Sequence, residues 1–204
     1  MSAKLKYTSD IAFTPSVKAI QEKFHSRNSY STMEKFGGWQ SEISEQLTHF
    51  LNSMDSFYLS TSNASGQPYT QHRGGPKGFL KTIDCKTLAF ADFSGNKQYI
   101  TTGNLSENNK AFIFLMDYRS KTRIKIWGTA KVIEDDKELL ESLSDASYKA
   151  RLERVIVFTV NAWDANCRQH IKQRFTEEDI KSITDPLEKK IAELETLIKK
   201  HNIK

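Results

Sequence analysis

"TRIKIWGTAKVI", residues 122–133, is the stretch that decides the fold class of this 204-residue chain. Successive side chains of an extended strand point to opposite faces, so Ile124 and Ile126 share one face with Thr122. The opposite face carries two cations and an indole: Arg123, Lys125 and Trp127. Such a face suits either solvent or the flank of a planar anionic ring. The strict alternation predicts a β-strand.

Strand-like stretches of similar length lie on both sides of this one. They are rich in aromatic and β-branched residues and are separated by short turns: 57–63, 68–73, 79–84, 87–93, 111–118 and 154–163. The stretch 111–118, "AFIFLMDY", is apolar enough to be buried on both faces. Six or seven short strands with tight turns predict a mainly β protein built on an antiparallel split barrel, a form that protects strand edges.

Helical patterns flank the strands at 14–27, 40–54, 134–144, 176–183 and 185–204. The last of these begins with Asp185 as cap and Pro186 in the first turn. It carries one apolar stripe: Leu187, Ile191, Leu194 and Ile198. We expect the stripe to pack on its own domain, with docking on a second subunit as the alternative. The chain is predicted to form a single domain with three parts: a helical segment 1–54, a barrel core 55–165 and a helical extension 166–204.

Composition excludes several classes of protein. The net charge of +5 is spread along the chain, without the block of basic residues typical of a nucleic-acid tail, so no nucleic-acid partner is expected. No run approaches the roughly 20 apolar residues of a membrane span, and no membrane association is expected. Cys85 and Cys167 form no CxxC pair, which favours free thiols and a cytoplasmic location.

A basic corner, "QHRGGPKGFLK" at 71–81, interrupts the strands. Arg73 offers a planar fork that suits a phosphate, and Lys77 offers a point charge. Gly74 and Gly75 would permit a positive φ and a close approach of the backbone to a ligand. The corner predicts an anion site, with a solvated hairpin corner as an equal alternative.

A second corner, "SGNKQ" at 94–98, follows another strand and can open a short helix. A helix start presents free N–H groups, which suit a phosphate, and Lys97 would add charge. An ordinary loop is the competing interpretation. Two Gly/Lys corners at the ends of neighbouring strands would together surround one phosphate.

Cys167 and His170 lie three residues apart in "NCRQHI". A metal site or a Cys–His nucleophile would fit such a pair, but no second pair stands at ligand spacing, so no metal is expected. Proximity of one Cys to one His is more often structural than catalytic. No GxSxG, HExxH or Walker-type phosphate loop is present in the sequence.

The order of these strands and corners resembles the pyridoxamine 5′-phosphate oxidase-like, FMN-binding split-barrel family. The resemblance covers roughly residues 40–170. It is similar above all to an uncharacterised branch with "HRGGPxGF", "GNxQYxxxGNL" and "NCxxHI" motifs, which stand here at His72–Phe79, Gly95–Leu105 and Asn166–Ile171.

The resemblance implies a homodimer with one FMN in each of two clefts at the subunit interface. It assigns the FMN phosphate to Arg73 and to the pair Asn96-Lys97, which stands where the oxidases carry Arg-Lys; Lys77 could replace the lost charge. Arg123 matches a position near the flavin ring. The other implied cofactor contacts come from the same two corners: Gly74, Gly75, Gly78, Phe79 and Gln98. The segment 166–170 is a candidate to reach the cleft from either subunit.

The function implied is that of an FMN-dependent oxidoreductase, which passes hydride between flavin N5 and a small substrate or a nicotinamide donor. Candidate catalytic groups are His72, Tyr99 and His170, although each also suits a structural hydrogen-bonding role. The chain lacks the Trp- and Arg-rich ending of the true oxidases and has a Gly-Pro insertion in the strand motif. Oxidation of pyridoxamine or pyridoxine 5′-phosphate is therefore one alternative, and a non-catalytic flavin- or haem-binding module is another.

Overall fold

The computed structural model describes three stretches of the chain: residues 6–145, 148–166 and 168–201. They divide into two compact units. The first unit holds the described residues of Met1–Met116 and Arg123–Cys167, and the second holds those of Asp117–Thr122 and Arg168–Lys204. Each unit is described by itself below.

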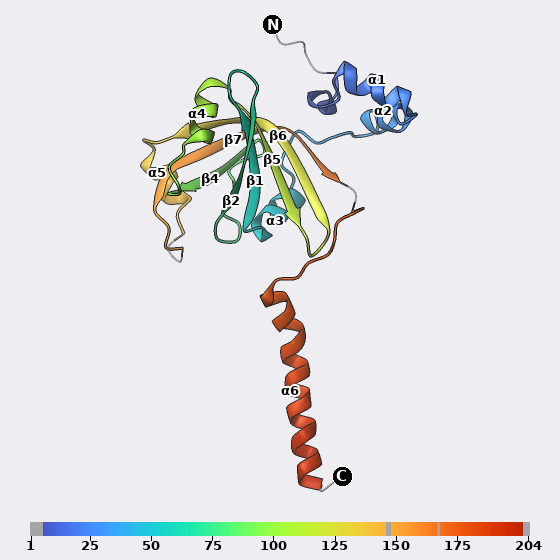
Figure 1. Cartoon of the computed structure of the whole chain (residues 1–204), viewed down its shortest axis with the longest axis vertical. Helices are drawn as coiled ribbons and strands as arrows, with labels where there is room; N and C mark the ends of the chain where they lie inside the picture. The colour runs from blue at the N-terminus through green and yellow to red at the C-terminus, as the bar shows by residue number, and fades with distance from the viewer. Residues whose placement is uncertain (1–5, 146–147, 167, 202–204) are drawn as a thin grey trace. The chain divides into compact units, whose positions relative to one another are not determined.

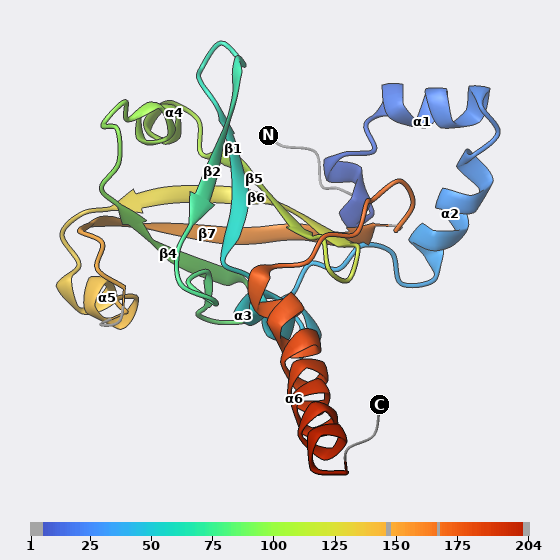
Figure 2. The same ribbon diagram turned by 60° about the horizontal axis from the view of Figure 1, so that its bottom comes forward.

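Seven antiparallel strands form one sheet in the order β2-β1-β5-β6-β7-β4-β3. Their bounds are β1 Ser56–Ser62, β2 Pro68–Gly74, β3 Lys81–Thr82, β4 Thr87–Phe93, β5 Lys110–Asp117, β6 Thr122–Ile133 and β7 Leu152–Asn166. The sheet curls strongly (Figure 2). Its edge strands β2 and β3 are not paired with each other within the described residues. The predicted mainly β, antiparallel split barrel with flanking helices is confirmed, as a sheet that pairing does not close.

The described chain contains six α-helices and one 3-10 helix. Their bounds are η1 Thr8–Ile11, α1 Pro15–Lys23, α2 Arg27–Lys35, α3 Glu45–Ser53, α4 Ile100–Glu107, α5 Lys137–Ser142 and α6 Glu177–His201. Within the first unit, α4 and α5 lie at one end of the sheet and α1 and α2 at the other (Figures 1 and 2). None of the described helices has a stretch both long and apolar enough to cross a bilayer.

The core lies in the concave side of the sheet. Along β1, Phe57, Leu59 and Thr61 are buried and alternate with more exposed residues, as a half-buried strand requires. Leu47 and Leu51 of α3 pack into the same apolar cluster, which confirms a helix within the predicted range 40–54. The Ser44 hydroxyl caps α3 by accepting a hydrogen bond from Leu47 N–H at 3.2 Å.

Several predicted elements have different bounds or faces. β5 is buried on one face only, so the prediction that it is buried on both was wrong. The first predicted helix ends at Lys23, because His25 takes a left-handed φ of 59°; Ile20 and Phe24, expected on a buried face, are exposed. The following helix α2 was not predicted.

The N-terminal segment lies along β7 of the first unit. Gln40 pairs with Trp163 through two backbone hydrogen bonds of 2.8 and 3.2 Å. The indole N–H of Trp163 also donates to the Glu42 carbonyl at 2.7 Å. These bonds place Trp39 against the outer face of β6.

The second unit combines the turn between β5 and β6 with the C-terminal segment. Arg119 forms an ion pair with Asp179 at 2.7 Å, and the guanidinium of Arg174 lies 4.5 Å from the centre of the Tyr118 ring. The two helices predicted at 176–183 and 185–204 are one continuous helix, α6, with Pro186 inside it. The predicted cap at Asp185 was therefore wrong.

Candidate functional site

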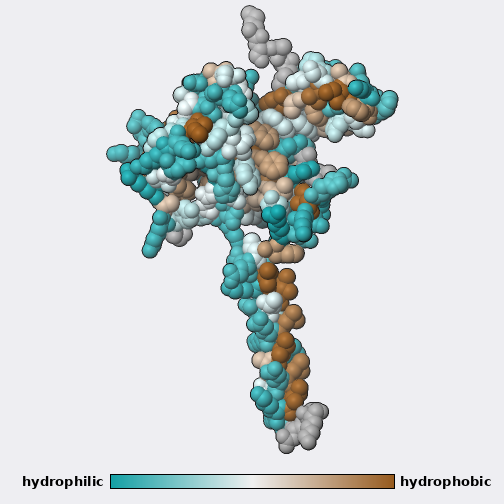
Figure 3. Space-filling view, viewed as in Figure 1, coloured by the Kyte–Doolittle hydropathy of each residue, from teal (hydrophilic) through white to brown (hydrophobic). Residues whose placement is uncertain are grey.

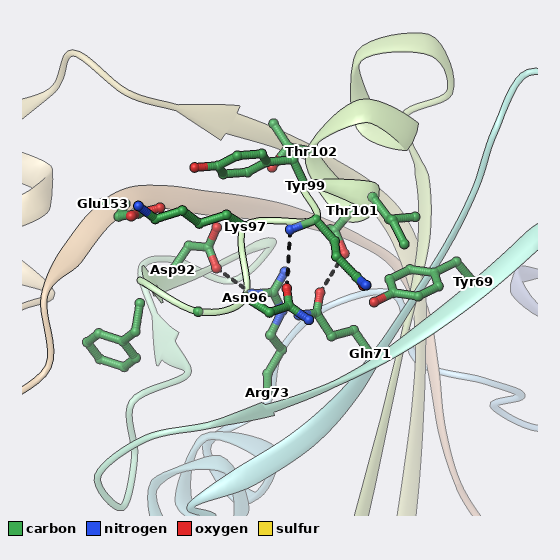
Figure 4. Close-up of a pocket in the computed structure, with 14 residues that line it drawn as sticks. Tyr69, Gln71, Arg73, Asp92, Asn96, Lys97, Tyr99, Thr101, Thr102 and Glu153 are labelled. Atoms are coloured by element: carbon green, nitrogen blue, oxygen red, sulfur yellow. Dashed lines mark hydrogen bonds and ion pairs between the residues drawn. The ribbon is translucent and has the colours of Figure 1, made fainter.

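A polar pocket opens where β2, the end of β4 and the start of α4 meet (Figure 4). Its cavity volume is about 50 Å³. The side chains that line it are mostly polar or charged and include Tyr69, Gln71, Arg73, Asp92, Asn96, Lys97, Gln98, Tyr99, Thr101, Thr102 and Glu153. The structure thus brings Arg73 of the first predicted corner together with Asn96 and Lys97 of the second.

Alternation along β2 selects which of its side chains reach the pocket. Arg73 pairs across the sheet with buried Phe57, and Gln71 pairs with buried Leu59, so both point to the concave side. His72 lies between them and points to the other face, where its ring contacts Tyr58 edge to face at 5.5 Å. The candidate catalytic residue His72 is therefore on the opposite side of the strand from the pocket.

Asp92 lies between two arginines in the pocket wall. Arg73 Nη1 donates to Asp92 Oδ1, and Arg154 Nε lies 3.8 Å from Asp92 Oδ2. All three side chains are only 12% exposed. The Nε atoms of both arginines are buried, and neither finds a hydrogen-bond acceptor among the described residues. Buried guanidinium groups with unused donors are suited to an anionic ligand.

The loop 94–99 adopts a conformation that few residues take. Lys97 and Tyr99 have φ values of 58° and 54°, in the left-handed region that non-glycine residues rarely occupy. The Asn96 side chain supports this turn by accepting a hydrogen bond from Gln98 N–H at 3.2 Å. Such strain is often found at functional sites. The turn leads into α4 at Ile100, and the predicted short helix after the second corner is confirmed.

The first turn of α4 contributes hydroxyl groups and free N–H groups to the same wall. Thr101 Oγ1 donates to Gln71 Oε1 at 2.8 Å, and Arg154 Nη1 donates to Thr102 Oγ1 at 3.3 Å. The Arg154 guanidinium also lies 5.1 Å from the centre of the Tyr99 ring. Arg154 therefore braces both the strained loop and the helix start.

The charges of the pocket nearly balance. The cations are Arg73, Lys97 and Arg154, and the carboxylates are Asp92 and Glu153. A hydrogen bond from the Ser94 hydroxyl, followed by the charges of Arg154, Arg151 and Lys97, lowers the pKa of Glu153. Glu153 is thus ionised at neutral pH, and the five groups together carry one net positive charge.

Other residues of the first corner do not line this pocket. A Cβ on Gly75 would lie 2.6 Å from the Phe79 ring, and a Cβ on Gly78 would lie 3.1 Å from the Asn52 carbonyl oxygen. Phe79 is buried and stacks on Phe57 with ring centres 5.3 Å apart. The positive φ expected at Gly74 and Gly75 occurs instead at Gly78, at 74°. Close packing under the sheet explains Gly75 and Gly78 without a ligand, and Lys77 and Gly74 also lie outside the pocket lining.

The predicted cationic face of β6 lies outside the pocket lining. Trp127 stacks on Trp39 with ring centres 4.5 Å apart, and Lys125 Nζ lies 5.2 and 5.1 Å from the centres of these two rings. Burial raises the pKa of Asp164, against the opposing charge of Lys125, which is 3.5 Å away. Arg123, on the same face, has a buried Nε without an acceptor in the described chain.

The predicted C-terminal candidates are described only in part. Cys167 and the side chain of Asn166 lie outside the described residues. His170 is exposed, in the second unit, with a φ of 61°. No group of three or more His, Cys, Asp or Glu side chains that could hold a metal ion occurs in the described part of the chain.

Sequence reasoning missed several members of the pocket. Tyr69 and Gln71 could have been found from the alternation that places them on the same face of β2 as Arg73. Thr101 and Thr102 could have been found from the predicted helix start, because they lie in the first turn of α4. Asp92 and Arg154 left no local signal, because their ion pair joins two strands that lie far apart in the sequence.

The structure combines a curled antiparallel sheet with a polar pocket beside its edge strand β2. Comparison with known proteins places the chain in a family. The family model described as pyridoxamine 5′-phosphate oxidase matches residues 43–167. This is more than half of the chain, and the protein belongs to that family. A search of curated proteins gives no significant match.

Three solved structures with a similar fold carry different functional descriptions. A putative pyridoxamine 5′-phosphate oxidase from Lactobacillus delbrueckii is 20% identical, with a TM-score of 0.48, over 61% of this chain and 95% of the other. An FMN-binding protein from Syntrophomonas wolfei is 16% identical, with a TM-score of 0.46, over 74% and 97%. HupZ from Group A Streptococcus is 16% identical, with a TM-score of 0.48, over 65% and 99%.

Proposed function

We propose that this protein is an FMN-dependent oxidoreductase that works as a homodimer in the cytoplasm, and that its pocket holds the phosphate of FMN. The observation that carries the proposal is the buried guanidinium of Arg73. Its Nε finds no acceptor among the residues that the structure describes, and it lies in a pocket with Lys97 and the start of α4. Family membership supports the choice of a flavin over other phosphate esters.

The residues present fit a phosphate dianion. Arg73 supplies directional donors, Lys97 supplies a mobile charge, and the hydroxyl groups of Thr101 and Thr102 supply further donors. Arg154 does not line the pocket itself, but it adds positive charge next to Asp92 and Glu153. The carboxylates of Asp92 and Glu153 offset part of this charge, which leaves one net positive charge. A bound phosphate would compete with Asp92 for Arg73, and it would find that arginine already turned toward the pocket (Figure 4).

FMN, when bound, supplies reversible hydride transfer to or from a small substrate or a nicotinamide donor. The protein's own task is then to anchor and orient. Arg73 and Lys97 fix the phosphate end. Arg123 is the proposed cation near the ring, where it would stabilise negative charge. Among the catalytic candidates, Tyr99 lines the pocket, whereas His72 points to the opposite face of β2.

Binding of flavins with and without a phosphate tests the anchoring role. We expect the Arg73→Ala/Lys97→Ala double variant to bind FMN at least about 100-fold more weakly, because each hydrogen bond from a charged donor contributes about 1.5–3 kcal/mol. The same variant should bind riboflavin almost as well as the unchanged protein does. Fluorescence titration measures both affinities.

Lys77→Ala is the matched control, because Lys77 belongs to the same basic corner but does not line the pocket. It should change FMN affinity by less than about threefold. If the double variant binds FMN as tightly as the unchanged protein, the phosphate site is elsewhere. A colourless protein that ignores added FMN would refute flavin binding altogether.

Reduction under anaerobic conditions tests the redox role. We expect NADH or NADPH to bleach the flavin absorbance of the loaded protein, because a catalytic flavoprotein exposes its ring to a donor. Bleaching that requires pyridoxamine 5′-phosphate, with peroxide released in air, would instead identify a vitamin B6 oxidase. A bound flavin that no donor reduces would indicate a non-catalytic binding module.

A further inference from the structure

Helix α6 of the second unit presents a continuous apolar stripe. Figure 3 shows it as a brown band along one side of the helix. Its side chains are aliphatic and 47–59% exposed: Ile180, Ile183, Leu187, Ile191, Leu194, Leu197 and Ile198. A stripe of this size on a charged helix indicates a contact surface.

The helix carries its own start and stop signals. The Thr176 hydroxyl accepts a hydrogen bond from Asp179 N–H at 3.1 Å, and the Asp179 carboxylate accepts one from Thr176 N–H at 3.0 Å, which together form a capping box. Acidic residues fill the first turn and basic residues the last, as the helix dipole favours. Most of the stability of a helix in a protein comes from packing of its apolar face, so this helix of 25 residues gains stability by burying its stripe.

The spacing of the stripe follows a heptad repeat, abcdefg, in which a and d face the partner. The d positions are Ile180, Leu187 and Leu194, and the a positions are Thr184, Ile191 and Ile198. Isoleucine at a with leucine at d favours two parallel strands. Ile183 and Leu197 fall at g and border this seam, and Pro186 falls at c, away from it.

The flanking charges specify the partner and its direction. Lys190 falls at g, and Glu188 and Glu195 fall at e. In a parallel pair, a g residue faces the e residue five positions further along the other chain, so Lys190 of each copy would meet Glu195 of the other. An antiparallel pair would place the e residues Lys181, Glu188 and Glu195 against e residues and g against g, so Lys190 and Glu195 would not meet.

We infer that α6 pairs with α6 of a second copy of this chain as a parallel, in-register, two-stranded coiled coil. The occupant of the stripe is the same stripe, which supplies both the apolar seam and the opposite charges at its border. About three heptads make a weak coiled coil alone. The inference therefore rests for its strength on the proposed homodimer, which would hold the two helices at high effective concentration.

Cysteine cross-linking of the full-length protein tests the seam. In a background with Cys85→Ser and Cys167→Ser, Leu194→Cys places a thiol at d and Thr196→Cys places one at f, on the outer side of the helix. In a glutathione redox buffer, we expect Leu194→Cys to form disulfide-linked dimer at least about ten times more than Thr196→Cys, because parallel d residues face each other. Equal or negligible cross-linking of the two variants overturns the inference.

A charge exchange tests the direction. In the Leu194→Cys protein, Lys190→Glu should lower the cross-linked fraction, because it places Glu against Glu195 of the partner. Adding Glu195→Lys should restore that fraction. Failure of the second change to restore it overturns the parallel register, since positions 190 and 195 would not meet in an antiparallel pair.

The two proposals can fail separately. Leu187→Asp breaks the stripe outside the pocket; in the Leu194→Cys protein it should abolish cross-linking and leave FMN affinity unchanged. Cross-linking that follows the heptad in a protein that binds no FMN would sustain the coiled coil and refute the proposed function. FMN binding without heptad-dependent cross-linking would refute the coiled coil and leave the proposed function standing.

Discussion

Asp92 is the carboxylate that holds the two pocket arginines in place. It contacts both guanidinium groups while all three side chains are nearly excluded from solvent. In such an arrangement the carboxylate compensates buried positive charge, and a ligand phosphate could take over that role. Asp92 is thus at once a positioning group for Arg73 and a competitor of the ligand.

We expect Asp92→Asn to destabilise the ligand-free protein by about 3 kcal/mol, because breaking a buried ion pair leaves charge uncompensated. FMN or inorganic phosphate should restore part of this loss. The rise in melting temperature on adding ligand should then be larger for the variant than for the unchanged protein. Asp135→Asn, at an exposed position, is the control. An equal rise in both proteins would show that no anion binds beside Asp92.

Asp164 should make stability depend on pH. Burial raises the pKa of its carboxyl group, so folding disfavours the ionised form; the penalty is present at neutral pH and disappears as the pH falls through the raised pKa. Asp164→Asn should therefore raise the free energy of unfolding at pH 7, by less than about 1 kcal/mol because the site is partly exposed. The gain should shrink at pH 4. Urea titrations at both pH values measure it, and a gain that grows toward pH 4 would contradict the assignment.

At the residue scale, the sequence predicted Arg73, Asn96 and Lys97 correctly as neighbours in space. It could do so because each stands at a strand end beside glycine, where local chemistry reveals an anion site. For Gly75 and Phe79 the structure shows a close tertiary contact that the local sequence did not reveal. Arg154 was also missed, because its place beside Asp92 depends on the pairing of β4 with β7.

Among the elements, β6 and β7 depend on one glycine. The register shifts between Trp127 and Gly128, which marks a bulge or irregularity in the ladder. A Cβ at Gly128 would lie 2.0 Å from the Thr159 carbonyl oxygen and 2.5 Å from the Phe158 ring. The first obstacle is backbone of β7 and the second is a ring buried in the core, so neither can move aside at low cost.

We expect Gly128→Ala to destabilise the protein by about 3 kcal/mol, at the upper end of overpacking costs. Gly103→Ala adds the same methyl group in α4, where no atom lies within 4 Å of the new Cβ. It should stabilise the protein by about 0.5–1 kcal/mol through helix propensity. Thermal melts of both variants measure the difference. Similar losses in the two would mean that the β6–β7 register is not as described.

The sequence predicted the type of most helices and strands better than it predicted where they begin and end. The alternation in 122–133 predicted β6 with its bounds, since period-2 patterning records which face is buried. The predicted break between two helices before Pro186 was wrong. Proline is tolerated inside a helix when its ring faces outward and neighbouring bonds compensate. The helix α2 is polar on most of its surface, and its only buried residue is Glu34. Glu34 accepts hydrogen bonds from Ser9 and Arg27, a contact that hydrophobic periodicity does not record.

The convex face of the sheet in the first unit carries several aromatic side chains among polar ones. Across β2, β1 and β5, His72, Tyr58 and Phe114 stand in one row on the convex side, and Tyr58 is 40% exposed. Phe112, on the same face of β5, packs on Trp127 with ring centres 5.0 Å apart. A second subunit on this side would cover these partly exposed rings. We therefore place the proposed dimer interface here.

Phe114→Glu tests this placement for the whole molecule. If the convex face meets its copy, two uncompensated carboxylates would be buried at the interface, and we expect the dimer to weaken at least about 100-fold. Ile83→Glu is the matched control, because Ile83 is 49% exposed and lies beyond β3, at the other edge of the sheet. Analytical ultracentrifugation should then find a monomer for Phe114→Glu and a dimer for Ile83→Glu. A dimer in both variants would place the interface on another surface of the protein.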